Sequence, residues 1–313
     1  MAIPLGSWLE TMREEYLASF IPAGGSAVRF VVVADPDQIQ YASIRLRDQG
    51  RQCGLTAICL DTATTKLHQL QNLFFAIAKA VDWDALTRTQ LERIVANSGY
   101  RWPEPGQRMS LAMLADANDV APGLLHTQIN QEITRIVWQD AGLAQDFRNA
   151  MIALLAARLA GDREAVRNTV MDWLQGAPGR LAGIREAGIG AKIGRNNARA
   201  MLKSLCRWVR LCGGNGILLV IDIGRLLRER REVQDGHVYS AAAVMDCYEV
   251  LRQTIDDASH LEGFFMTVIA DPPLLADDGR RSLNQYTALK MRVWDDVRPR
   301  QGDNMLAPLV QLQ

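Results

Sequence analysis

The chain has 313 residues, and its 35 Lys and Arg balance 35 Asp and Glu, so the formal net charge is zero. This balance excludes a protein that is basic throughout and binds nucleic acid by overall charge, although it is compatible with a local basic patch. Hydrophobic residues make up 48% and charged residues 22%, which is typical of a globular protein rather than a disordered or fibrous one.

Nothing in the sequence indicates export or a membrane span. No apolar run reaches the roughly 18 residues that a membrane helix needs. The N-terminal segment MAIPLGSWLETMREEY lacks the basic and apolar regions of a secretory signal. The five cysteines have neither CxxC nor zinc-ligand spacing. We therefore expect a cytoplasmic protein with free thiols, no metal site and no membrane contact.

Five apolar, mostly β-branched segments predict strands, and helical patterns lie between most of them. The predicted strands are 29–34, 55–60, 217–221, 264–270 and 309–312. Helical spacing is expected at 37–52, 196–211 and 240–258. Continuous apolar runs are typical of strands that are buried on both faces of a parallel sheet. The alternation of strands and helices therefore predicts an α/β fold with a doubly wound parallel sheet.

The long stretch from 65 to 175 has helical spacing and no convincing strand, so it predicts an all-helical insertion. It has one clear break, WPEPG at 102–106, where prolines stop a helix. The glycine-rich stretch 176–194 predicts a loop or hinge that returns to the sheet. The expected organisation is a first part of the core at 1–64, the insertion at 65–175, and the return loop with the rest of the core at 176–313.

The third predicted strand has the form of a Walker B segment, which ends in an acidic residue that helps to hold the Mg²⁺ of a nucleotide. That residue is Asp222. The pattern alone is weak, because many parallel strands end in Asp only to cap the next turn. An ATPase normally places a Glu next, to polarise the attacking water, whereas this chain has Ile223, which cannot accept a proton.

The residues after the first predicted strand do not form a phosphate-binding loop. Such a loop reads GxxxxGK[ST], with main-chain N–H groups, a lysine and a hydroxyl that contact phosphates and Mg²⁺. Here the segment 33–40 reads VADPDQIQ and contains no Gly, Lys, Ser or Thr. Pro36 has no N–H to donate, and Asp35 and Asp37 would place negative charge beside a triphosphate.

Several motifs, in this order, resemble the ATP-binding proteins of BREX and related antiphage defence systems, which are P-loop ATPases of AAA+ type with a helical insertion. The matching segments are IPAGGSAVRF at 21–30, WLQG at 173–176, the helix at 196–213, the Walker B segment at 216–222, Asp271–Pro272, Arg280–Arg281, YTALKMR at 286–292 and APLVQL at 307–312. The resemblance covers nearly the whole chain. It implies a P-loop NTPase-like parallel sheet flanked by helices, with a large all-helical insertion.

In the register of that family, the nucleotide-binding positions hold residues that cannot do the chemistry. The P-loop glycines fall on Val33, Pro36 and Gln38, and the Walker A lysine and hydroxyl fall on Ile39 and Gln40. The Walker B Glu falls on Ile223, and a sensor position that is Thr in relatives falls on Asp271. Because these losses converge on one ligand, we expect binding of ATP and Mg²⁺ to be lost, with no catalytic residue and no cofactor.

Three functions stay open. The first is a catalytically inactive ATPase-like subunit of a bacterial antiphage defence complex. The resemblance implies that its partners are other defence proteins, such as an active ATPase, a helicase or a methyltransferase, in a homo- or hetero-oligomer. The second is an unconventional ATPase completed by a neighbouring subunit, with Arg280, Arg281 and Arg292 as candidate interface arginines.

The third function is a binding module for a cation or an amine. In this interpretation Asp35, Asp37, Asp222 and Asp271 gather at one sheet edge and raise one another's pKa. Direct contact with DNA is a separate question. The basic run RLLRERR at 225–231 also contains a glutamate and is more typical of a solvated helical face than of a DNA-binding track.

Overall fold

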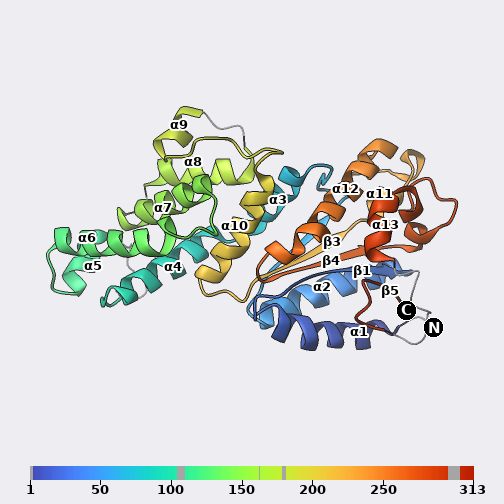
Figure 1. Ribbon diagram of the computed structural model, residues 1–313, viewed down its shortest axis with the longest axis horizontal. Coiled ribbons are helices and arrows are strands. Elements are labelled where there is room, and N and C mark those ends of the chain that lie inside the picture. Colours follow the sequence, from blue (N-terminus) through green and yellow to red (C-terminus); the bar gives the residue numbers. More distant parts are fainter. Residues whose placement is uncertain (1–2, 104–109, 162, 178–180, 295–303) are drawn as a thin grey trace. The chain divides into compact units, whose positions relative to one another are not determined.

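The computed structural model describes residues 3–103, 110–161, 163–177, 181–294 and 304–313, and the chain divides into two compact units (Figure 1). The sheet unit comprises Met1–Ile77 and Gly214–Gln313, and the helical unit comprises Ala78–Gly213. The sheet unit is therefore built from two stretches of chain that are separated in sequence by the whole helical unit. The domain boundaries expected from the sequence, after residues 64 and 175, stay a prediction.

The sheet unit contains five parallel strands in the order β2-β3-β4-β1-β5. They are β1 Ser26–Val33, β2 Thr56–Asp61, β3 Ile217–Asp222, β4 Phe264–Ala270 and β5 Leu309–Leu312. The predicted α/β fold with a parallel sheet is confirmed, and it is consistent with a P-loop NTPase-like fold. β4 is buried along its whole length, as expected for a central strand covered on both faces. β1 begins earlier than predicted, at Ser26 instead of residue 29.

Helices cover both faces of this sheet. In Figure 1, α1 and α2 lie on one side of the sheet, and α12 and α13 lie on the other. These helices are α1 Leu5–Thr11, α2 Pro36–Gln52, α12 Ala241–Asp257 and α13 Thr287–Val293, with the π-helix η1 Met12–Phe20 continuing α1. Trp8, Leu17 and Leu46 from the first group pack with Val31 and Phe265 in one apolar core. Shorter pieces are α11 Gly224–Leu227, η3 Arg230–Glu232, η4 Ala258–His260, η5 Pro272–Leu275 and η6 Leu283–Gln285.

The described residues of the helical unit contain helices and no strand, as the helical spacing predicted. The helices are α4 Trp83–Asn97, α5 Leu111–Ala117, α6 Pro122–Ile133, η2 Thr134–Trp138, α7 Gln145–Leu159, α8 Glu164–Gln175, α9 Leu181–Glu186 and α10 Ala198–Leu211. The helix α3, Leu70–Ala80, crosses the boundary between the two units. In the predicted break at 102–106, residues 104–106 lie outside the described residues.

The prediction of a continuous loop at 176–194 is wrong, because the short helix α9 forms inside it. Two of its glycines lie at the ends of helices. Gly176 ends α8 with a left-handed φ of 71°, and Gly188 follows α9 with a φ of 74°. A glycine at such a position adopts the conformation that ends a helix without steric strain. Glycine enrichment here thus marks helix ends rather than an irregular segment.

The entries to β3 and β4 approach so closely that only glycine fits. Gly216 precedes β3 with a φ of 130°, and a Cβ atom on it would lie 2.2 Å from the carbonyl oxygen of Gly263. That same oxygen accepts the N–H of Ile217 at 2.8 Å, so it is held in place by the ladder. The register between β3 and β4 therefore depends on the missing side chain at Gly216.

We predict that Gly216→Ala lowers the free energy of unfolding by about 2 kcal/mol or more, because it adds both a clash and an unfavourable φ. Chemical denaturation of the whole chain measures this change. The control is Gly6→Ala in α1, where no atom lies within 4 Å of the added methyl. It should be neutral or slightly stabilising, because alanine favours a helix. Equal stability of the two variants would contradict the packing argument.

Candidate functional site

The parallel strands place several acidic residues at one edge of the sheet, here called the carboxyl edge. Asp61 is the last residue of β2, Asp222 is the last residue of β3, and Asp271 directly follows β4. The turn from β1 into α2 lies at the same edge. In open α/β sheets, ligands bind outside the carboxyl ends of the strands, so this edge is where a nucleotide would be bound.

The turn from β1 to α2 leaves no room for a phosphate-binding loop. β1 ends at Val33 and α2 begins at Pro36, so only residues 34 and 35 connect them. Asp35 caps the helix, and its carboxylate accepts the N–H of Asp37 at 2.9 Å. A P-loop offers free N–H groups to phosphate at this helix end. Here one N–H is absent at Pro36 and another is bound by the chain's own carboxylate.

The two positions aligned with the lysine and the hydroxyl of Walker A differ in how far their side chains are buried. Ile39 is only 9% exposed and packs in the apolar core together with Leu46. Gln40, the next residue, is exposed, and Gln38 is half-buried. The helix expected at 37–52 is present as α2 and begins one residue earlier, at Pro36. Asp35 at the N-cap and Pro36 at the first helical position are typical of a helix start.

Asp222 is a half-buried carboxylate with acidic neighbours. It lies opposite Asp61 in the register of β2 and β3, and it accepts the N–H of Gly224 at 2.8 Å. Burial raises the pKa of the Asp222 carboxyl above its ordinary value of 3.8. The charges of Asp61 and Asp271 add to this increase, while the Gly224 N–H and the charge of Arg225 oppose it.

Asp271 is buried and has one ionic partner. Its Oδ2 pairs with Arg228, whereas its Oδ1 has no hydrogen-bond partner among the described residues. A Cβ on Gly224 would lie 3.1 Å from Asp222 Oδ1 and 3.8 Å from Asp271 Oδ1, so both carboxylates border the same glycine. Ile223, which follows Asp222, has its side chain buried in the core.

The predicted gathering of carboxylates is therefore only partly present. Asp222 and Asp271 come together, and Asp61 joins them, which its place at the end of a predicted strand would have indicated. Asp35 and Asp37 are not among the charges that act on Asp222. In the described ranges, no three His, Cys, Asp or Glu side chains are arranged to hold a metal ion.

The candidate interface arginines differ in how they are engaged. Arg281 donates to the carbonyl oxygens of Leu226 at 3.1 Å and of Tyr239 at 2.8 Å, so it fixes the main chain after β3. Arg292 pairs with Asp256 of α12. Arg280 is exposed. The carboxyl edge therefore has Arg228 and Arg281 as structural cations, a role that sequence reasoning did not assign to Arg228.

The basic run at 225–231 does not form the single helical face that its pattern suggests. α11 ends at Leu227, and the 3₁₀ turn η3 begins at Arg230. Arg228, whose side chain is 47% exposed, pairs with the buried Asp271, and Arg231 pairs with Glu229. The run is interrupted because its charges bind neighbouring carboxylates rather than forming a stripe.

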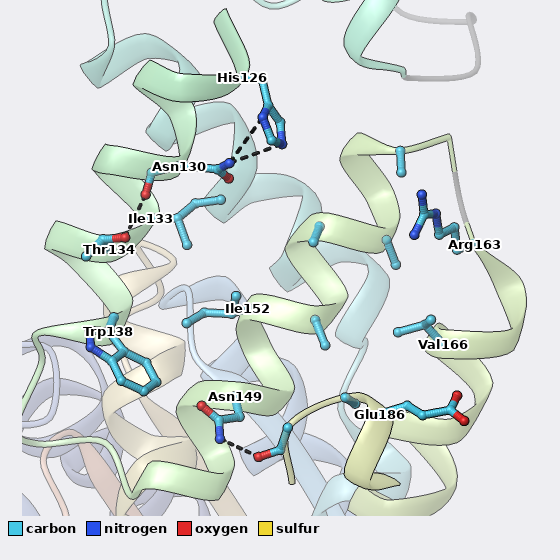
Figure 2. Close-up of a pocket in the computed structure, with 16 residues that line it drawn as sticks. His126, Asn130, Ile133, Thr134, Trp138, Asn149, Ile152, Arg163, Val166 and Glu186 are labelled. Carbon is cyan, nitrogen blue, oxygen red and sulfur yellow. Dashed lines mark hydrogen bonds between the residues drawn. The ribbon is translucent and has the colours of Figure 1, made fainter. Parts of the chain in front are cut away.

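Two hollows of the molecule are lined by none of the residues of the carboxyl edge. One, of about 780 Å³, is in the helical unit (Figure 2), where Trp138 and Ile133 face Ile152 of α7. Asn149 at its border donates to the carbonyl oxygen of Gly188 at 2.5 Å. The other hollow, of about 760 Å³, is in the sheet unit beside the first half of β1.

A comparison with models of protein families matched residues 55–313 to the BREX system ATP-binding proteins BrxC/D. The chain belongs to this family. The matched residues begin after β1 and α2, so the Walker A position lies outside the match, whereas Asp222 and Asp271 lie inside it. Comparisons with curated proteins and with solved structures found no match. Among the described helices of this BREX-family chain, none has the length and apolar character to cross a membrane.

We predict that Asp222→Asn becomes progressively more stable relative to the unchanged chain as the pH rises from about 4 to about 7. A carboxyl with a raised pKa favours the fold while it is protonated, and this contribution is lost as the pH rises through its folded pKa. Asparagine cannot ionise, so it avoids the loss. Denaturation curves at several pH values test this, with exposed Asp278→Asn as the control for removing one charge. A pH-independent difference would contradict the raised pKa.

We also predict that Ile39→Lys does not restore a Walker A lysine but destabilises the fold by about 2 kcal/mol or more, because it places an ammonium group in an apolar core. Gln40→Lys, on the exposed neighbour, should change stability by no more than about 0.5 kcal/mol. Urea denaturation compares the two variants. A stable Ile39→Lys variant that gained affinity for ATP would show that this side chain can reach a nucleotide.

Proposed function

We propose that the chain is a pseudo-ATPase: a subunit of a BREX antiphage defence complex that keeps the ATPase core as a scaffold and neither binds nor hydrolyses ATP. The observation that carries this proposal is the turn from β1 to α2. It is two residues long, and Asp35 occupies the helix end at which a P-loop would bind phosphate.

Electrostatics at this turn supports the proposal. A triphosphate at the N-terminus of α2 would meet the carboxylates of Asp35 and Asp37 with no lysine to offset them. Near a protein surface, two like charges about 4 Å apart repel by about 4 kcal/mol. The lysine position is Ile39, which contributes to the core instead. Changing one residue would therefore not recover a nucleotide site.

The scaffold interpretation also accounts for what the chain retains. The sheet, its parallel register, the half-buried Asp222 and the buried Asp271 are kept, while Ile223 stands at the position of the water-polarising glutamate. As a member of a defence family, the chain would present its surface to other proteins of the system, such as an active ATPase, a helicase or a methyltransferase in the cytoplasm. Of the candidate interface arginines, Arg280 and Arg292 are both exposed, but Arg292 is paired with Asp256, so Arg280 is the better placed to reach a neighbouring subunit.

Titration calorimetry of the whole chain with ATP and Mg²⁺, and separately with ADP, tests the proposal directly. We expect no heat of binding and no thermal stabilisation up to millimolar nucleotide. Binding at micromolar affinity, about −8 kcal/mol, would overturn it. Asp222→Ala would then decide whether the nucleotide binds at the carboxyl edge, because loss of binding in this variant would point to an unconventional ATPase.

A further inference from the structure

The ladder of the sheet is incomplete beside the first half of β1. β4 pairs with β1 from Ser26 to Val32, but on the other side β5 pairs only with Phe30–Val33. Pro308 precedes β5 and has no N–H to extend the ladder. The chain before it turns back, with the N–H of Ala307 bonded to the carbonyl oxygen of Asn304 at 3.1 Å. In the described part of the chain, Ser26–Arg29 therefore form an open strand edge.

The hydrogen bonds that flank this edge show which main-chain groups face it. The carbonyl oxygen of Gly25 accepts the N–H of Phe264, on the β4 side. The N–H of Phe30 is bonded to the carbonyl oxygen of Pro308, on the β5 side. Because successive residues of a strand direct their polar groups to opposite sides, Ser26 and Val28 face the open edge. An open edge of this kind is a template for another strand.

The hollow of about 760 Å³ runs along this open edge, and its walls are largely apolar. Tyr16 and Phe20 of η1 line one wall, and Ile255, Ala258 and Val293 line the other. Phe20 is 46% exposed although it is a large aromatic side chain. The segment η1, which contributes Tyr16 and Phe20, is a π-helix, a rare geometry that occurs frequently at functional sites. We call the hollow together with the edge Ser26–Arg29 the β1 edge groove.

Arg29 in the groove makes no ion pair among the described residues, although Glu15 also lines the hollow. Arg29 donates through Nη1 to the carbonyl oxygen of Val28 at 2.8 Å and through Nη2 to the hydroxyl of Tyr16, whose ring lies 4.7 Å from the guanidinium carbon. Its buried Nε has no hydrogen-bond partner among the described residues, and neither does the buried Oγ of Ser26. Arg292, the other arginine in the groove, is already paired with Asp256.

We propose that the β1 edge groove binds an extended peptide segment of a partner protein. The segment would add a strand beside Ser26–Arg29 and place an Asp or Glu side chain on Arg29. Main-chain hydrogen bonds to Ser26 and Val28 supply affinity in this mode of recognition, and the apolar walls select the alternate side chains. The acidic side chain follows from the buried Nε of Arg29, whose N–H has no acceptor among the described residues and could donate to a carboxylate. This inference is independent of whether the carboxyl edge binds nucleotide.

The test is a selection of short random peptides, displayed on phage, against the whole immobilised chain. We expect the selected peptides to carry an acidic residue flanked by β-branched or aromatic residues. Against a synthetic selected peptide, Arg29→Leu should weaken binding about tenfold or more, because it removes a charge-assisted hydrogen bond. The matched control is Arg45→Leu, since Arg45 is likewise stacked on a tyrosine, Tyr41, but is exposed on α2 outside the groove.

A second measurement leaves the protein unchanged, so it holds even if Arg29→Leu does not fold. Methylating alternate main-chain nitrogens of the selected peptide should abolish binding in one of the two alternating patterns and not in the other. Failure to select any peptide would overturn the proposal. So would a result in which both methylated peptides bind as well as the unmethylated one and Arg29→Leu binds the peptide as tightly as the unchanged chain. Free N-acetylglutamate that binds as tightly as the peptide would also overturn it. So would self-association that Arg29→Leu abolishes, which would assign the groove to a second copy of the chain.

Discussion

The parallel hydrogen bonding of the five strands is the constraint on which the rest of the sheet unit depends. Because every strand runs in the same direction, the carboxyl ends of β2, β3 and β4 and the turn after β1 must all lie at one edge. Asp61, Asp222 and Asp271 are brought together by this register rather than by any local motif. The same register aligns Gly216 with Gly263 at the opposite edge, where the strands enter the sheet.

Much of this arrangement could be predicted from the sequence, because a continuous apolar run of a few residues is enough to indicate a buried parallel strand. The fold class, the strands and the family follow from such runs and from the order of motifs. Two features could not be predicted in this way. Arg228 pairs with the buried Asp271, and β5 is too short to cover Ser26–Arg29. Each depends on residues that are far apart in sequence or on where one element stops.

In the described part of the chain, the carboxyl edge of the sheet unit is closed by its own side chains, whereas Ser26–Arg29 of β1 have no strand on one side. At the carboxyl edge, Asp35 binds the helix N–H of Asp37, and Arg228 compensates Asp271. Beside β1, among the described residues, the carbonyl oxygen of Val28 accepts a hydrogen bond from the guanidinium of Arg29. The proposed peptide site therefore lies on the flank of the sheet and shares no residue with the carboxyl edge.

The position of β1 in the chain also has a consequence for how the protein is made. Ser26 pairs with Phe264, and the whole helical unit is synthesised between these two residues. Because synthesis proceeds at roughly 5–20 residues per second, β4 emerges from the ribosome on the order of ten seconds or more after β1. During that time α1, η1 and α2 are available to cover one of its faces, while both of its edges lack a strand. Because β1 meets its partner strand only after the helical unit has been made, the sheet is completed late in synthesis.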